Sequence, residues 1–191
     1  MNTSSFNIAT WLTLLRIALI PVLVLLFYLP WSGARVICAL IFLLASLTDW
    51  LDGYLARRLN QTTAFGAFLD PVADKLMVAA ALVLLVQNDP EPWLAVGAVI
   101  IIGREIAIAS LREWMAELGQ RKKVEVSWLG KVKTTLQMSA ITLLLFAVDW
   151  WTEVLRPFGY LFLVLAALMT LWSMVNYLRL AWPSLMEADD P

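Results

Sequence analysis

The sequence predicts an all-α integral membrane protein with six transmembrane helices that enclose a polar cavity. Hydrophobic residues make up 61% of the 191 residues and charged residues only 15%, with a mean hydropathy of +0.77. A soluble domain would carry about 25% charged residues. We expect a single membrane domain over residues 1–191, with a short interfacial helix at 2–11. Its six apolar segments are 10–29, 34–58, 65–87, 92–117, 130–149 and 158–180.

The segments differ in how their apolar residues are distributed. The first is apolar apart from Arg16, and the last is apolar until Asn176 and Arg179. The turn Asp89-Pro90-Glu91-Pro92 separates the third segment from the fourth. Each of the middle four has an apolar run without charges that covers roughly 16 Å as helix, about half the hydrocarbon thickness. These runs are 37–47, 76–86, 93–102 and 138–148.

Charged residues fill the other half of each middle segment, and the order of the halves alternates. Segments 34–58 and 92–117 are apolar first and charged last, whereas 65–87 and 130–149 begin with their charges. Because consecutive spans cross in opposite directions, every charged half lies on the same side of the membrane. The pattern therefore predicts one polar cavity that opens toward a single leaflet.

Basic residues indicate which side this is. The connections on the opposite side carry only Arg35 and Arg156. The cavity side carries Arg57, Arg58, Arg121, Lys122, Lys123, Lys131, Lys133 and Arg179. Since cytoplasmic loops are enriched in lysine and arginine, we expect the cavity, both termini and the loops near residues 60 and 122 to face the cytoplasm.

Composition excludes several other functions. A net charge of −1 and the lack of a basic tail argue against nucleic acid as a partner. Cys38 is the only cysteine, so no intrachain disulfide is possible. Arg16 interrupts the first apolar run, so we expect this span to be retained rather than cleaved as a signal peptide. Histidine is absent, which leaves a carboxylate, or else a lysine or tyrosine, as a general base.

Four aspartates around the second loop are the strongest functional signal. Asp49 and Asp52 are three residues apart, and Asp70 and Asp74 are four apart, so each pair lies on one helical face. The loop between them, 59–64, is short and polar, which lets the two helices fold back with their carboxylates facing each other. Buried carboxylates are costly unless cations neutralise them. Hard oxygen ligands favour Mg²⁺, Mn²⁺ or Ca²⁺.

The alternative is that these carboxylates lie exposed at helix ends on the membrane surface. Helical phase argues against it, because small residues share the faces of the aspartates and leave space for a ligand. One stripe holds Asp49, Asp52, Gly53, Ala56 and Arg57, and a second holds Gly66, Asp70 and Asp74.

The pattern D-x2-D-G-x2-A-R-x8-G-x3-D-x3-D at 49–74 resembles the signature of the CDP-alcohol phosphotransferases, with every fixed position present. That family transfers a phosphatidyl or similar group from a CDP-linked lipid to an alcohol, within six transmembrane helices. The resemblance implies a two-metal site for Mg²⁺ or Mn²⁺ on the CDP diphosphate, formed by Asp49, Asp52, Asp70 and Asp74. It implies Asp74 as the general base, and donor contacts from Asp52, Gly53, Ala56, Arg57 and Gly66.

Three further stretches, 7–21, 104–119 and 128–138, look like one branch of that family, the bacterial phosphatidylglycerophosphate synthases. Those enzymes join sn-glycerol 3-phosphate to CDP-diacylglycerol and release CMP. The resemblance implies the same two substrates here. It also implies a multi-pass protein of the bacterial inner membrane that contacts membrane lipids and forms a homodimer.

Basic residues of the later spans are candidates for binding the acceptor's phosphate. Glu105 and Arg112 are seven residues apart and share a face, so we expect an ion pair between them. Arg104 lies about 100° round the helix from Glu105, where it can contact the phosphate. We assign the acceptor phosphate to Arg104, Lys131, Lys133, Arg112 and Thr13.

Two of these assignments have specific alternatives. Lys131 and Lys133 lie about 200° apart if both are helical, so both reach one point only if the helix begins late. Either lysine can instead extend to the interface. In the first span Thr13 and Arg16 share a face loosely, and Arg16 lies deep enough to need a partner.

Two other functions compete with this interpretation. A cardiolipin synthase of the same family would use phosphatidylglycerol as its acceptor. A divalent-cation carrier would also place carboxylates among helices, but the apolar halves of the spans offer no acidic or amide residue to pass an ion onward.

Overall fold

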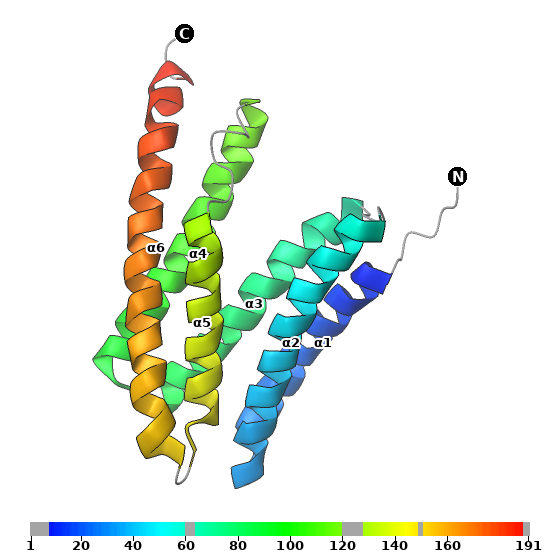
Figure 1. Cartoon of the computed structure of the whole chain (residues 1–191), viewed down its shortest axis with the longest axis vertical. Helices are drawn as coiled ribbons and strands as arrows, with labels where there is room; N and C mark the ends of the chain where they lie inside the picture. The colour runs from blue at the N-terminus through cyan, green and yellow to red at the C-terminus, as the bar shows by residue number, and fades with distance from the viewer. Residues whose placement is uncertain (1–7, 60–63, 120–127, 149–150, 189–191) are drawn as a thin grey trace.

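The computed structural model describes residues 8–59, 64–119, 128–148 and 151–188, which form six α-helices and no strand (Figure 1). The helices are α1 (Ile8–Phe27), α2 (Ser32–Leu59), α3 (Ala64–Asn88), α4 (Pro92–Glu117), α5 (Trp128–Phe146) and α6 (Thr152–Ala188). Each predicted segment corresponds to one helix, so the all-helical class is confirmed. Of the predicted interfacial helix, 2–7 lies outside the described residues and 8–11 belongs to α1.

Among the described residues, three helices are long and apolar enough to cross a membrane: α1 over Thr10–Phe27, α4 over Pro92–Glu117 and α6 over Thr152–Trp182. Their mean hydropathies are 2.2, 2.0 and 2.0. Length does not separate α2 and α3 from them, because these helices have 28 and 25 residues. Both carry aspartates of the central motif, which lower their hydropathy. The number of six spans stays a prediction.

The helices form two groups that meet at one end and diverge at the other (Figure 1). α1 packs on α2 and α3, while α6 packs on α4 and α5. The groups contact each other through α2 with α5, and through α3 with α4 and α5. The ends of α2 and α4 and the start of α3 lie at the diverging end, so the aspartates that α2 and α3 carry lie toward it as well.

All six helices contribute to the main hydrophobic core. Small residues let the helices approach closely: a Cβ on Gly159 of α6 would lie 2.7 Å from the Leu144 side chain of α5. Below 3 % exposure, the core includes Leu23, Phe42, Leu82, Ile101, Leu145 and Leu163, one residue from each helix.

Polar side chains connect the end of α3 to α6 at the end of the molecule remote from the aspartate motif. Asp89, just after α3, accepts hydrogen bonds from Arg156 Nη2 at 2.5 Å and from the Tyr160 hydroxyl at 2.7 Å. Tyr28 donates to Gln87 at the same end. The bonds of Asp89 join the two groups where they converge, whereas the bond between Tyr28 and Gln87 lies within the group of α1, α2 and α3.

Candidate active site

Three helices bring polar side chains together around Arg16 of α1. Its Nη1 donates to Asp49 Oδ1 of α2 at 2.8 Å and to Asp70 Oδ1 of α3 at 3.1 Å. Thr13, one turn earlier on α1, donates to the same Asp70 oxygen at 3.3 Å. Arg16 is only 2% exposed, whereas Asp49 and Asp70 are 33% and 39% exposed. The partner expected for Arg16 is therefore a pair of motif aspartates.

Asp74 lies one turn after Asp70 on α3 and is half-buried. Its charge interacts with those of Asp49, Asp70 and Arg16 from its own group of helices. It also interacts with Glu105, which belongs to α4 of the other group. Asp74 therefore lies close enough to both helix groups for its charge to interact with charged side chains of each.

The arrangement of Asp49 and Asp70 suits a cation. One nitrogen of Arg16 contacts an oxygen of each, so positive charge already lies between carboxylates from two helices. Carboxylate oxygens are the ligands that Mg²⁺ and Mn²⁺ prefer. Within the described ranges no three acidic side chains converge on one point, and the side chain of Asp52 lies outside them. The donor set that the structure does describe fits a hard divalent ion.

A second charged cluster lies between α4 and α5, and we call it the basic cluster. It consists of Arg104, Glu105, Arg112 and Lys133. Glu105 Oε1 accepts from Lys133 Nζ at 2.5 Å and from Arg104 Nη1 at 3.0 Å. Both cations are buried, with Lys133 3% and Arg104 8% exposed. The expected pair between Glu105 and Arg112 is wrong: Arg112 Nη2 instead donates to the Tyr177 hydroxyl of α6 at 3.1 Å. Spacing along α4 could not reveal this, because α5 provides Lys133 for Glu105 and α6 provides Tyr177 for Arg112.

Lys131 and Lys133 point in different directions, as their helical spacing predicts. Since α5 begins at Trp128, both lysines lie within the helix. Lys133 is buried against Glu105, whereas Lys131 is exposed and lines a cavity together with Asp49. Lys131 therefore lies on the side of the motif aspartates, which we call the aspartate side, and Lys133 lies in the basic cluster.

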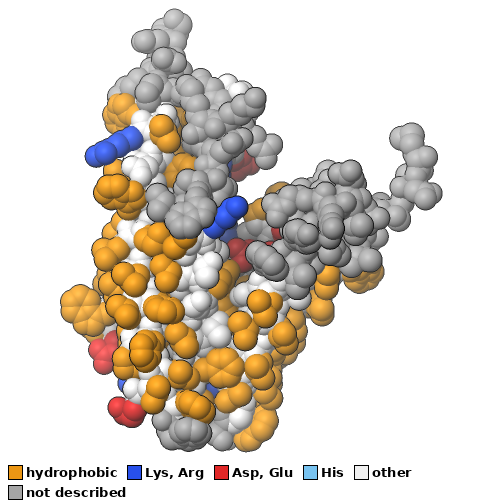
Figure 2. Space-filling model, viewed as in Figure 1, with side chains coloured by type: hydrophobic (Ala, Val, Ile, Leu, Met, Phe, Trp, Pro, Cys, Tyr) orange, Lys and Arg blue, Asp and Glu red, His pale blue; other side chains and the backbone are white. Residues whose placement is uncertain are grey.

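This cavity, about 840 Å³ in volume, lies between α2 and α5 at the divide between the two groups. Asp49 and Lys131 line it together with apolar side chains, namely Leu43, Leu47, Met138, Leu143 and Phe162. Acidic and basic side chains are visible where the groups part, and apolar side chains cover the surface below them (Figure 2). The cavity therefore joins a charged region to an apolar one.

Hydroxyl groups in the cavity wall do little to make it polar. Thr134, Thr135 and Thr142 donate to the carbonyl oxygens of Gly130, Lys131 and Met138, all four residues earlier on α5. Because the hydroxyls are satisfied within their own helix, the threonine methyl groups are left to line the cavity. The α5 side of the cavity is thus suited to hydrocarbon.

Of the residues predicted to bind the donor besides the metal ligands, the structure describes only the surroundings of Gly66. Gly66 is half-buried in α3. The side chains of the α2 residues Asp52, Gly53, Ala56 and Arg57 lie outside the described residues. Their assignment rests on the sequence motif.

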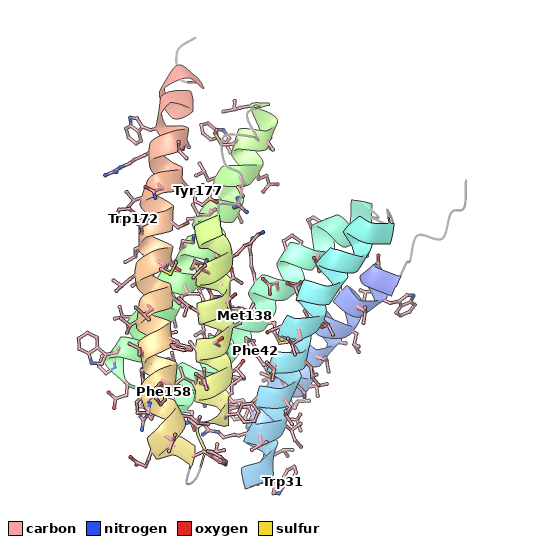
Figure 3. The ribbon with its side chains drawn as sticks, in the orientation of Figure 1. Trp31, Phe42, Met138, Phe158, Trp172 and Tyr177 are labelled. Atoms are coloured by element: carbon pink, nitrogen blue, oxygen red, sulfur yellow. The ribbon has the colours of Figure 1, made fainter. Side chains whose placement is uncertain are left out.

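Ser173 and Tyr177 contact the basic cluster and were missed by the sequence analysis. Arg104 Nη2 donates to Ser173 Oγ at 2.9 Å, and the ring of Tyr177 lies under the guanidinium groups of Arg104 and Arg112. Tyr177 lies on the part of α6 beside α4 (Figure 3). The available signal was a serine and a tyrosine four residues apart in an apolar span, which does not specify a partner helix.

Known proteins resemble this chain over almost its whole length. Residues 6–174 match the family model for CDP-alcohol phosphatidyltransferase. A protein of Yersinia enterocolitica named CDP-diacylglycerol–glycerol-3-phosphate 3-phosphatidyltransferase is 55% identical over 95% of this chain and 98% of its own length. Proteins of the same name from Sodalis glossinidius and Pectobacterium atrosepticum are 55% and 56% identical with the same coverage. The chain therefore belongs to the CDP-alcohol phosphatidyltransferase family.

Proposed function

We propose that this protein transfers the phosphatidyl group of CDP-diacylglycerol to sn-glycerol 3-phosphate, giving phosphatidylglycerophosphate and CMP. The main support for this proposal is that two charged regions lie on opposite sides of the divide between the helix groups. Asp49, Asp70 and Asp74 lie on one side, and the basic cluster around Glu105 lies on the other. The relatives that cover almost the whole chain are named for this reaction.

The basic cluster supports a phosphorylated acceptor. Arg104, Lys133 and Arg112 carry three positive charges and Glu105 carries one negative charge, which leaves two positive charges in excess. A phosphate monoester carries roughly −1.5 to −2 at neutral pH, so its charge matches this excess. The diester phosphate of phosphatidylglycerol carries only one negative charge. The cluster therefore favours glycerol 3-phosphate over the acceptor of a cardiolipin synthase.

The donor would occupy the aspartate side. Asp49, Asp52, Asp70 and Asp74 would hold two ions, Mg²⁺ or Mn²⁺. When bound, such ions neutralise the diphosphate and stabilise the departing CMP. Gly53, Ala56 and Gly66 would leave room for the cytidine diphosphate beside Arg57. The apolar wall of the α2–α5 cavity begins at Asp49, so an acyl chain can run from the reacting phosphate along it.

In the reaction, the free primary hydroxyl of glycerol 3-phosphate attacks the phosphorus that bears diacylglycerol. A new P–O bond forms, the P–O bond to the CMP phosphate breaks, and Asp74 accepts the hydroxyl proton. Arg104, Arg112 and Lys133 hold the acceptor phosphate so that its hydroxyl reaches this phosphorus. Lys131 was assigned to the same phosphate, but in the structure it lines the α2–α5 cavity with Asp49. Thr13 was assigned to the same phosphate, and in the structure it donates to Asp70, which makes it a support of the aspartate side.

The proposed setting is the bacterial inner membrane, with six spans and the divide open to the cytoplasm. The excess of basic residues on the side of the aspartates supports this orientation. Membrane lipids would cover the exposed apolar side chains of the helices. A homodimer is proposed on the family resemblance.

An acceptor screen tests the function. Purified protein is mixed with Mg²⁺ and CDP-diacylglycerol, and CMP release is measured with glycerol 3-phosphate, glycerol or phosphatidylglycerol. We expect release only with glycerol 3-phosphate. Release with phosphatidylglycerol alone would instead identify a cardiolipin synthase. Uptake of Mn²⁺ by proteoliposomes without any CMP release would identify a cation carrier.

A further inference from the structure

Tyr177 of α6 contacts both arginines of the basic cluster. The Cζ atoms of Arg104 and Arg112 lie over its ring, 5.7 Å and 5.4 Å from the ring centroid. The hydroxyl accepts a hydrogen bond from Arg112 Nη2 at 3.1 Å. The two arginines are two helical turns apart on α4, and this one aromatic side chain joins them.

The position of the ring is fixed by its surroundings. Tyr177 is 7% exposed and packs with Ile108, Met115 and Ala181 in a small hydrophobic cluster between α4 and α6. This cluster is separate from the main core. A tyrosine with a packed ring has few rotamers available, so its π face and hydroxyl stay where the two helices place them.

Such a ring stabilises two like charges in one cluster. The negative face of an aromatic ring attracts guanidinium groups, which offsets part of the repulsion between Arg104 and Arg112. Arg104 is fixed at two further points, by Glu105 and by Ser173. Arg112, by contrast, has Tyr177 as its only hydrogen-bond partner in the described part of the chain.

Both guanidinium groups keep unused donor capacity. The Nε of Arg104 and the Nε of Arg112 are buried without a hydrogen-bond partner among the described residues. Buried donors are normally paired, and arginine has five donors in a planar arrangement that matches phosphate oxygens. Two oriented guanidinium groups with spare donors are suited to a phosphate that bonds to both.

We infer that Tyr177 is a positioning residue for the acceptor phosphate, which it serves by orienting Arg104 and Arg112. The inference rests on the proposed function, because it concerns the acceptor of that reaction. Tyr177 itself does not react and does not contact the donor. Its loss should therefore weaken the use of glycerol 3-phosphate and leave the binding of CDP-diacylglycerol intact.

Two substitutions separate the ring from the hydroxyl. Tyr177→Leu removes both, and we expect KM for glycerol 3-phosphate to rise about tenfold. Tyr177→Phe keeps the ring and should raise this KM only about threefold. In both variants KM for CDP-diacylglycerol and kcat should stay within about twofold of the wild-type values. Arg104→Ala serves as the reference for the loss of a guanidinium group.

Tyr160 offers a matched control on the same helix. Its hydroxyl also bonds to a charged side chain, Asp89, but at the opposite end of the molecule. Tyr160→Leu and Tyr160→Phe should leave KM for glycerol 3-phosphate unchanged. If they raise it as much as the Tyr177 variants do, the effect is a general loss of α6 packing and the inference is wrong.

The outcomes also separate this inference from the proposed function. If the wild-type protein releases no CMP with glycerol 3-phosphate, both fail. If the wild type and Tyr177→Leu show the same KM for glycerol 3-phosphate, or if both substrates are affected equally, only the inference fails. If Tyr177→Leu does not fold, Tyr177→Phe decides: an unchanged acceptor KM overturns the role of the hydroxyl on Arg112.

Discussion

Arg16 lies between two carboxylates that would otherwise repel each other. It is buried, and it is shared by Asp49 and Asp70 from different helices. Removing one partner of a buried ion pair is strongly destabilising, by about 3–5 kcal/mol, because the other charge is left uncompensated. The partial exposure of both aspartates reduces this cost, since water can solvate them. Arg16 thus keeps the two aspartate-bearing helices together.

This role predicts how Arg16→Ala responds to metal. We expect the variant to unfold at a lower temperature than the wild type in detergent without divalent ions. Millimolar Mg²⁺ should recover most of the difference, because the ion neutralises the same carboxylates. Thermal unfolding with and without Mg²⁺ measures this. An equal loss of stability under both conditions would show that the carboxylates do not bind the ion.

The aspartates should also differ from one another in their effects. Asp74→Asn should keep CDP-diacylglycerol binding but lose turnover by roughly 10²–10⁴-fold, the usual scale for a removed general base. Asp49→Asn, Asp52→Asn and Asp70→Asn should weaken metal and donor binding together. The comparison requires turnover at saturating metal and donor. Near-normal turnover of Asp74→Asn under those conditions would make Asp74 a metal ligand only.

At the scale of elements, α2 presents opposite environments at neighbouring residues. Leu43 lines the α2–α5 cavity, whereas Leu44 is 59% exposed on the outer face. Leu43→Trp should fill part of the cavity and raise KM for CDP-diacylglycerol about tenfold, because an acyl chain loses about 0.8 kcal/mol for each methylene it cannot bury. KM for glycerol 3-phosphate should not change.

Leu44→Trp is the matched control for this prediction. It adds the same side chain to the same helix but outside the cavity, so both KM values should stay at their wild-type levels. Steady-state kinetics with each substrate varied in turn makes the comparison. Equal effects of the two substitutions would mean that the acyl chains do not use this cavity.

Helices and local spacing were predictable from the sequence, whereas partners across helices were not. Hydropathy and turn residues placed all six helices, although α6 extends beyond the predicted 158–180 to Thr152–Ala188. The spacing of Lys131 and Lys133 correctly predicted that they diverge. Glu105, however, pairs with Lys133 from α5, and Tyr177 meets the arginines through the packing of α6 on α4. Such contacts depend on helix register, which a single sequence does not encode in any local pattern.

For the whole molecule, the two helix groups converge at the Asp89 cluster and part at the aspartate motif. We predict that the converging end faces the periplasm and that the diverging end faces the cytoplasm. In a background without Cys38, cysteines at Glu91 and Thr152 should react with an impermeant maleimide added to intact cells. A cysteine at Gly119 should react only after the membrane is opened. The reverse pattern would invert the proposed orientation.

In the proposed reaction, the acceptor hydroxyl attacks the phosphorus bearing diacylglycerol and displaces CMP. Glycerol 3-phosphate labelled with ¹⁸O in its primary hydroxyl, supplied with CDP-diacylglycerol and Mg²⁺, tests this directly by mass spectrometry of the products. We expect the label in phosphatidylglycerophosphate and an equal amount of unlabelled CMP. Phosphatidic acid together with a labelled phosphodiester of CMP and glycerol 3-phosphate would contradict it, because the hydroxyl would then have attacked the CMP phosphorus.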